Sequence, residues 1–162
     1  MSSSQGRLAD LEAIYRKRWA AFARIAVSIS GSAELGKEVV QEGFARAIEQ
    51  QTQFRGECPL EAWVLRIIVN GAHTAGQRAA REATEVAHQP EIPLSNGHSQ
   101  PSGIDLWVRT LPERQRLVVF LRYWGDLEYR AIADVLEVEV GTVSATLSAA
   151  HQALRRSLQE VQ

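Results

Sequence analysis

Residues 127–158 read LEYRAIADVLEVEVGTVSATLSAAHQALRRSL, and this stretch decides the fold of the C-terminal part of the chain. It predicts a short helix from Leu127 to Leu136, a turn over Glu137-Val138-Glu139 and a longer helix from Val140 to Leu158. The apolar residues placed to form a core between the two helices are Ile132, Ala133, Leu136, Val138, Val143 and Leu147. A short helix, a tight turn and a longer helix around one core are typical of a helix-turn-helix.

Two further helices are predicted directly upstream of this motif. One runs from Ile104 to Thr110, and the next begins at Leu111-Pro112-Glu113, because proline is favoured in the first turn of a helix. Gly125-Asp126 ends this second helix. Its apolar face consists of Leu117, Val118, Phe120, Leu121 and Trp124.

The N-terminal part opens with two predicted helices that meet at Gly31-Ser32. Gly31 is typical of a helix end, and Ser32 is a favoured N-cap residue, followed by Glu34 in the first turn. Gly36 and Gly43 lie inside the second helix, where each costs up to ~1 kcal/mol relative to alanine. We therefore expect these glycines to allow close packing against a neighbouring helix.

A third helix is predicted from Leu60 to about Arg81, after a loop over Thr52 to Pro59. Together the three helices predict a three-helix bundle. The apolar residues at helical spacing are Leu8, Leu11, Ile14, Tyr15, Trp19, Phe22, Ala23, Ile25, Ala26 and Ile29 in the first helix, Leu35, Val39, Val40, Phe44, Ala47 and Ile48 in the second, and Trp63, Val64, Ile67, Ile68 and Ala72 in the third.

Residues 83–103 are rich in Pro, Gly, Ser and Asn, which is typical of a linker. They divide the chain into a domain over 1–82 and a domain over 104–162. Strand-like alternation of apolar and polar residues is absent from the sequence. The predicted fold class is therefore all-α, with a helical bundle joined by a flexible linker to a helix-turn-helix domain.

Composition and charge exclude several classes of protein. The 162 residues include 18 Lys and Arg against 19 Asp and Glu, and this balance argues against holding duplex DNA by bulk electrostatics. The longest stretch without a charged residue, Val140 to Leu154, is shorter than the ~20 apolar residues of a membrane span. We expect any DNA binding to be local, weak or assisted by a partner, and we expect no transmembrane segment.

Cysteine and histidine usage bears on the compartment and on metal binding. The single cysteine, Cys58, cannot form an internal disulfide, and the N-terminus lacks an apolar signal core, so we expect a cytoplasmic protein. The histidines show no paired ligand spacing, and the chain has no glycine-rich nucleotide motif. We therefore expect no metal, no cofactor and no enzymatic activity.

Five motifs, taken in order, resemble a known family. Glu38 to Ala47 (EVVQEGFARA) is similar to an acidic-Leu-Val-Gln-Glu-x-Phe run, and Ala62 to Asn70 (AWVLRIIVN) to a Trp-Leu-x-Arg-Ile-x-x-Asn run. Leu111 to Arg116 (LPERQR), Tyr129 to Ala133 (YRAIA) and Val140 to Val143 (VGTV) complete the series. In this order they resemble the extracytoplasmic-function (ECF) sigma factors, bacterial initiation factors that direct RNA polymerase to promoters.

The resemblance implies three working surfaces. Docking on the clamp helices of the largest polymerase subunit is implied for Glu38, Val39, Gln41 and Glu42. Contact with the single-stranded minus-ten element is implied for Phe54, Arg55, Trp63, Arg66, Asn70, Gln77, Arg78 and Arg81, because aromatic and Arg side chains stack on splayed bases. Contact with the minus-35 duplex is implied for Arg114, Arg130, Thr142, Ser144, Ala145, Thr146, Ser148, His151, Arg155 and Arg156. The partners implied are core RNA polymerase, promoter DNA and an anti-sigma factor, which such proteins often have.

The chain departs from the family pattern in places that bear on DNA binding. Thr74 stands where an Asp is usual, and Glu137 stands in the turn where a Gly is common. Between Arg130 and Arg155 there is no Lys or Arg, although recognition helices of the family usually carry them. A helix without cations forfeits phosphate contacts, so we expect low affinity for the minus-35 element.

Two alternatives stay open at this level. A sigma-like adaptor would keep the polymerase-docking helix but use its uncharged C-terminal helix to contact protein rather than duplex DNA. A purely structural reading places Trp63, Ile67 and Ile68 in the core and treats Glu38 to Glu42 as an ordinary solvated helix face.

Overall fold

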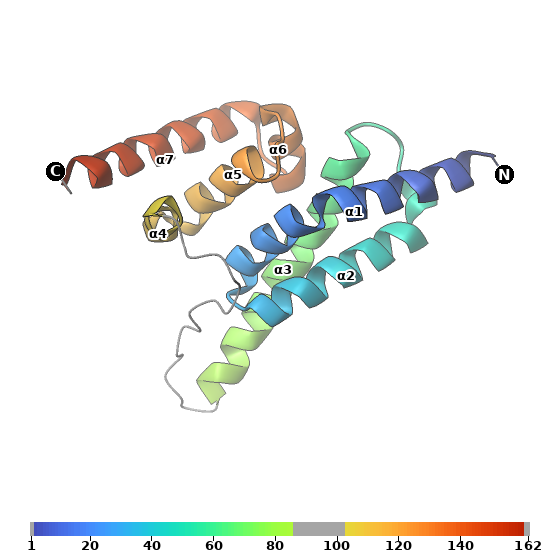
Figure 1. Cartoon of the computed structure of the whole chain (residues 1–162), viewed down its shortest axis with the longest axis horizontal. Helices are drawn as coiled ribbons and strands as arrows, with labels where there is room; N and C mark the ends of the chain where they lie inside the picture. Colours follow the sequence, from blue (N-terminus) through green and yellow to red (C-terminus); the bar gives the residue numbers. More distant parts are fainter. Residues whose placement is uncertain (1, 86–102, 161–162) are drawn as a thin grey trace.

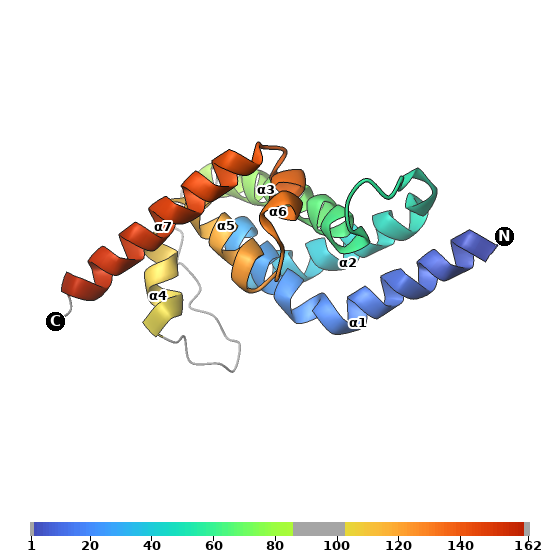
Figure 2. The ribbon, with the colours of Figure 1, turned by 90° about the horizontal axis from the view of Figure 1, so that it is seen from above.

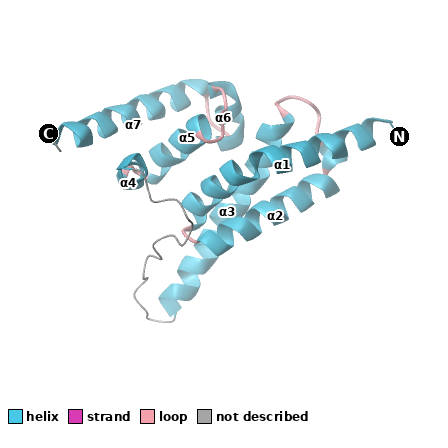
Figure 3. Ribbon diagram, viewed as in Figure 1, coloured by secondary structure: helices cyan, strands magenta, loops and turns pink. Residues whose placement is uncertain are grey.

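The computed structural model describes residues 2–85 and 103–160 and is helical within them (Figures 1 and 3). The elements are α1 (Ser2–Ser30), α2 (Ala33–Glu49), the 3-10 helix η1 (Gln51–Gln53), α3 (Leu60–Glu85), α4 (Gly103–Thr110), α5 (Glu113–Tyr123), α6 (Tyr129–Leu136) and α7 (Val140–Glu160). The described ranges contain no strand, which confirms the all-α prediction. Helix α3 continues four residues past the predicted end, and most of the predicted linker, 86–102, lies outside the described residues.

Helices α1, α2 and α3 pack against one another as the predicted three-helix bundle. The two glycines of α2 lie at close approaches between helices, as expected. A Cβ atom at Gly43 would stand 2.5 Å from Cγ1 of Ile68 on α3, and one at Gly36 would stand 2.8 Å from the backbone nitrogen of Val27 on α1. An alanine at Gly43 would require the Ile68 side chain to shift, and one at Gly36 would require the backbone of α1 to shift.

The junction between α1 and α2 also forms as predicted. Gly31 has a φ of 79°, in the left-handed region that favours glycine, and its N–H donates to the carbonyl of Val27. The Ser32 hydroxyl accepts a hydrogen bond from the Leu35 N–H at 3.4 Å, which caps α2.

The apolar pattern predicted the core of the bundle correctly but also included three residues that are exposed. Phe22, Ile25, Val40 and Ile68 are fully buried, whereas Leu8, Tyr15 and Ile48 are exposed. Leu8 lies near the N-terminal end of α1, the end of the helix that contacts η1 (Figures 1 and 2).

The C-terminal part forms a second helical unit in which α7 packs on α4, α5 and α6. Ile132, Val143 and Leu147 are buried between the helices of the motif, which confirms the helix-turn-helix. Two predicted helix starts shift by one or two residues. Pro112 precedes α5 as its N-cap, and α6 begins at Tyr129 rather than Leu127.

The turn of this motif contains a strained residue. Glu137 ends α6 with φ 57° and ψ 45°, and its N–H donates to the carbonyl of Ala133. A non-glycine residue in this left-handed conformation costs roughly 1–2 kcal/mol. Glycine would fit this turn without that cost.

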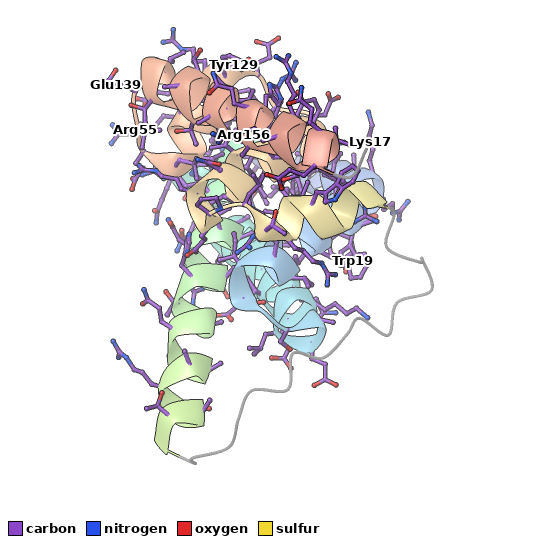
Figure 4. All side chains as sticks on the ribbon, turned by 90° about the vertical axis from the view of Figure 1, so that its left-hand side faces the viewer. Lys17, Trp19, Arg55, Tyr129, Glu139 and Arg156 are labelled. Atoms are coloured by element: carbon purple, nitrogen blue, oxygen red, sulfur yellow. The ribbon has the colours of Figure 1, made fainter. Side chains whose placement is uncertain are left out.

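The two units contact each other through α3 with α6 and α1 with α5, whereas α7 contacts none of α1, α2 and α3. Helix α7 therefore lies on the outer side of the C-terminal unit (Figure 1). The last turns of α3, beyond Gly76, project away from the other helices in two perpendicular views (Figures 1 and 4).

Candidate polymerase and nucleic-acid surfaces

The acidic face of α2 is accessible along most of its length. Glu38, Gln41 and Glu42 are exposed. The Glu42 carboxylate pairs with Arg46 at 2.6 Å, but both side chains are more than half exposed, so the pair adds little stability and leaves Glu42 available. The face can therefore offer two carboxylates and an amide to a basic partner.

Val39 is the exception in the predicted docking set. It is only 6% exposed, and it lies so close to α3 that a Cβ at Gly71 would stand 3.3 Å from its Cγ1. Val39 therefore offers a partner little surface and packs α2 against α3. Its docking contact stays a prediction.

An aromatic pair joins the loop before α3 to the start of that helix. The ring centroids of Phe54 and Trp63 lie 5.4 Å apart, and the Arg7 guanidinium lies 5.5 Å from the centre of the Phe54 ring. Arg7 also donates to the carbonyl of Gln51 at 2.6 Å. Trp63 is half-buried, so it packs against the core and stays partly accessible to solvent. Arg55, beside this pair, is exposed.

The polar residues predicted on α3 form one outward stripe. Arg66, Asn70, Gln77 and Arg81 recur at intervals of four and seven residues, which places them on the same face, and all are exposed. Arg78, next to this stripe, is also exposed. The residues of the stripe from Gln77 onward lie on the projecting last turns of α3 (Figure 4).

Two contacts modify this stripe. Thr74 stands where an Asp is usual, and a threonine adds no negative charge to the stripe. Its hydroxyl donates to the carbonyl of Asn70 at 3.1 Å. The Arg66 guanidinium forms an ion pair with Glu137 in the turn of the helix-turn-helix. The stripe is therefore occupied at one residue by the C-terminal unit and open at its distal end.

The outward face of α7 carries small polar groups. Thr142, Ser144, Ala145 and Ser148 are exposed, while Thr146 is half-buried and its hydroxyl donates to the carbonyl of Thr142 at 2.7 Å. The cations come only at the far end of the helix. Arg155 and Arg156 are exposed there, and Figure 4 labels Arg156 on α7.

His151 and Tyr123 form a pair at the edge of this face. The Tyr123 hydroxyl lies 2.8 Å from Nε2 of His151, and the Tyr123 ring is 56% exposed. The sequence pattern did not single out Tyr123, because it ends the apolar helix α5 and lies 28 positions from its partner. It adds an aromatic surface and fixes the orientation of the imidazole.

The remaining predicted cations lie on other helices. Arg114 is exposed in the first turn of α5. Arg130, in the first turn of α6, lines a hollow between the two units, together with carboxylates that include Glu57, Glu61 and Asp134. In this arrangement its surroundings are acidic.

Cys58 lines the same hollow. Partial burial, followed by the negative charge of Asp134, raises the pKa of its thiol, although nearby Arg66 opposes the shift. The thiol is therefore protonated near neutral pH and is a poor nucleophile.

Across 2–85 and 103–160, no cluster of His, Cys, Asp and Glu could hold a metal ion, and no described helix is long and apolar enough to cross a membrane.

Comparison with family models assigns both units. Residues 14–82 match Sigma-70 region 2, and residues 104–154 match Sigma-70, region 4. The chain is 30% identical over 139 residues to the ECF RNA polymerase sigma-E factors of Escherichia coli and Salmonella typhi, which covers 75% of this chain and 73% of those proteins. It is 26% identical over 145 residues to the RNA polymerase sigma-H factor of Pseudomonas aeruginosa, covering 78% and 75%.

Two solved structures share the fold. The sigma factor RpoE in complex with the anti-sigma factor NepR from Bartonella quintana superposes with a TM-score of 0.74 at 20% identity, covering 93% of this chain and 97% of that chain. CnrH in complex with the cytosolic domain of CnrY superposes with a TM-score of 0.70 at 20% identity, covering 99% and 95%.

Proposed function

Because the chain belongs to the ECF family of RNA polymerase sigma factors, we propose that its exposed helix faces divide the work of binding core polymerase and reading promoter DNA. The observation that carries this proposal is the order of the two family regions, each matched to a helical unit of the expected kind. We propose two domains, 1–82 and 104–162, on the same grounds, with the proposed linker 83–103 overlapping the end of α3 at Glu85 and the start of α4 at Gly103. The protein is a bacterial initiation factor that recruits polymerase to promoters.

The acidic face of α2 is the proposed polymerase contact. Glu38, Gln41 and Glu42 would meet basic groups on the clamp helices of the largest subunit, and their exposure supports this role. Complementary charge steers such an encounter and fixes its register.

The loop before α3 and the outward stripe of that helix are the proposed minus-ten contact. Phe54 and Trp63 offer ring surface, and Arg66 and Asn70 offer donors suited to unpaired bases. Stacking contributes about 1–3 kcal/mol per base. Gln77, Arg78 and Arg81 would hold the strand farther along the projecting last turns of α3.

The outward face of α7 is the proposed minus-35 contact. Thr142, Ser144 and Ser148 can donate to and accept from base edges in the major groove, and the Ala145 methyl can contact a thymine methyl. Arg155, Arg156 and Arg114 would hold phosphates at the periphery. With few cations available, the polymerase must supply most of the electrostatic grip on DNA.

A second candidate function is an adaptor in which α7 contacts a protein instead of duplex DNA. The absence of Lys and Arg between Arg130 and Arg155 favours it. An anti-sigma factor is also a proposed partner, since the structurally similar RpoE of Bartonella quintana is a sigma factor in complex with the anti-sigma factor NepR. We further propose that the protein acts in the cytoplasm, where promoter DNA is found, and has no enzymatic activity of its own.

Transcription from a genomic library with reconstituted holoenzyme, read as start sites, tests the proposed function. A sigma factor produces a narrow set of new start sites that share sequence at two upstream positions. An adaptor gives no start sites beyond those of core enzyme alone.

A further inference from the structure

In every polar contact described between the two units, the basic groups come from the N-terminal unit and the acceptors from the C-terminal unit. Arg66 pairs with Glu137, and His73 Nδ1 lies 3.5 Å from Glu113 Oε1. Arg18 donates to the carbonyl of Gly125 at the end of α5.

An aromatic contact extends this series. The Arg24 guanidinium lies 5.8 Å from the centre of the Trp124 ring, and Trp124 is half-buried. Arg18 also donates to the Trp124 carbonyl at 3.5 Å and pairs with Glu61 within its own unit at 2.5 Å. The side chain of Arg18 is only 17% exposed, so this guanidinium is held in place between the units.

Apolar residues surround these polar contacts. On α3, Ala62 and Val69 are buried and share a helix face with Arg66 and His73 by their spacing. On α6, Ala131 and Val135 are buried and lie four positions apart, on one face of the helix. Because α3 and α6 pack together, these small side chains form the dry part of the contact.

Glu137 is the unusual residue in this interface. Its backbone is left-handed, with φ 57°, in a turn where the family commonly has glycine. Strain of this kind persists when a residue serves a purpose that the relaxed alternative would lose. Here the carboxylate supplies the acceptor for Arg66, which a glycine could not do.

We propose that the polymerase-free protein closes its two units on each other, with the Glu137–Arg66 ion pair as a latch that occupies a minus-ten residue. The side chains of Arg66 and Glu137 are 44% and 61% exposed, so the pair is reachable by solvent and screened by salt. It is therefore weak enough to open when a partner or DNA competes for Arg66. Only the occupation of a DNA contact rests on the proposed function.

The test for closure measures the distance between the units in the full chain without polymerase or DNA. Spin or dye labels go at Lys37→Cys on α2 and Gln152→Cys on α7, both exposed, in a Cys58→Ser background. The wild-type latch is expected to give one dominant, narrow distance distribution, that of the packed units, and opening is expected to add a broad distribution. Glu137→Gln, which keeps the size and the backbone strain but removes the charge, is expected to lower the ratio of closed to open molecules by roughly two- to fivefold.

Charge reversal makes the assignment specific. Arg66→Glu places two carboxylates together and is expected to lower the ratio about tenfold, while Arg66→Glu with Glu137→Arg restores it. Glu139→Gln is the matched control, because Glu139 is exposed two residues away and forms no ion pair within the described ranges. Circular dichroism verifies that each variant is folded. The same distance distribution in wild type, Glu137→Gln and Arg66→Glu would overturn the latch.

A second arm tests whether the latch occupies a DNA contact. Binding of a fluorescent single-stranded minus-ten oligonucleotide is expected to strengthen about two- to fivefold in Glu137→Gln, and to show no such gain when Arg66→Ala is also present. If closure changes while oligonucleotide binding does not, the occupation of a DNA contact is overturned. Failure of the distance test alone leaves the sigma-factor assignment standing, because that test uses neither polymerase nor promoter.

Discussion

Helices α3 and α7 carry the two surfaces proposed for DNA. The two surfaces differ in charge and in whether the other unit contacts them. The stripe on α3 and the adjacent Arg78 supply three arginines, of which Arg66 is engaged by the C-terminal unit. The outward face of α7 is uncovered by the N-terminal unit but has no cation before Arg155. The comparison teaches that a chain of nearly neutral charge can place its charge-dependent contacts on one helix and its base-edge contacts on another.

The largest expected effect is the loss of core polymerase binding, on which both proposed DNA surfaces depend. Glu38→Lys with Glu42→Lys reverses two charges that would face a basic clamp, which costs several kcal/mol and is expected to abolish binding of core polymerase. Pull-down of core enzyme measures this. Glu12→Lys with Glu160→Lys makes the same change in net charge at exposed sites on α1 and α7 and should retain binding. Retention of polymerase by the Glu38 and Glu42 variant would remove α2 from the docking surface.

The next effect concerns the α3 surface alone. Arg66→Ala and Asn70→Ala should each weaken strand opening by about 1–3 kcal/mol, because each removes a proposed contact to displaced bases. Permanganate reactivity of promoter thymines in the holoenzyme complex is the readout, and core binding should be unchanged. Arg109→Ala removes an exposed arginine of α4 as the control. Wild-type reactivity in both α3 variants would reduce these residues to surface positions.

A gain of function tests the α7 surface. Ser144→Lys with Ser148→Lys adds two cations one turn apart at exposed positions, which should strengthen binding to specific and scrambled duplexes alike. The slope of log affinity against log salt should steepen by about 0.9 for each phosphate contacted, or up to about 1.8 in total. Fluorescence anisotropy at several salt concentrations measures it. No gain on either duplex would mean that this face does not approach DNA.

The smallest expected effect is at the edge of α7. Tyr123→Phe keeps the ring and removes the hydroxyl that meets His151, a hydrogen bond with a net value of roughly 0.5–1.5 kcal/mol. Holoenzyme affinity for a promoter duplex should fall by no more than about tenfold. His151→Ala should remove any further effect of Tyr123→Phe, and additive losses in the double variant would show that the two residues act separately.

The local features of this fold were predictable because neighbouring residues determine them. Gly31 and Ser32 mark the end of α1 and the start of α2, and the spacing of Ile132, Val143 and Leu147 defines the helix-turn-helix. Val39 shows where a pattern is ambiguous. It lies in both an apolar series and a family motif, and the packing of α2 on α3 decides that it is buried.

The contacts that shape the candidate surfaces were not predictable in the same way. Arg7 with Phe54, Tyr123 with His151 and Arg66 with Glu137 join residues far apart in the chain. Helical periodicity specifies which face of a helix is polar, but not which other helix meets that face. Glu137 was visible as a departure from the family, and only the packed structure gives its carboxylate a partner.

The most direct test of the central claim locates α7 on a promoter. A chemical nuclease tethered at Ser148→Cys, in a Cys58→Ser background, is incorporated into holoenzyme and activated on a template with a mapped start site. If α7 reads the minus-35 element, cleavage falls at that element on both strands. Accurate initiation by the same holoenzyme without cleavage there would contradict the account and assign α7 to a protein partner.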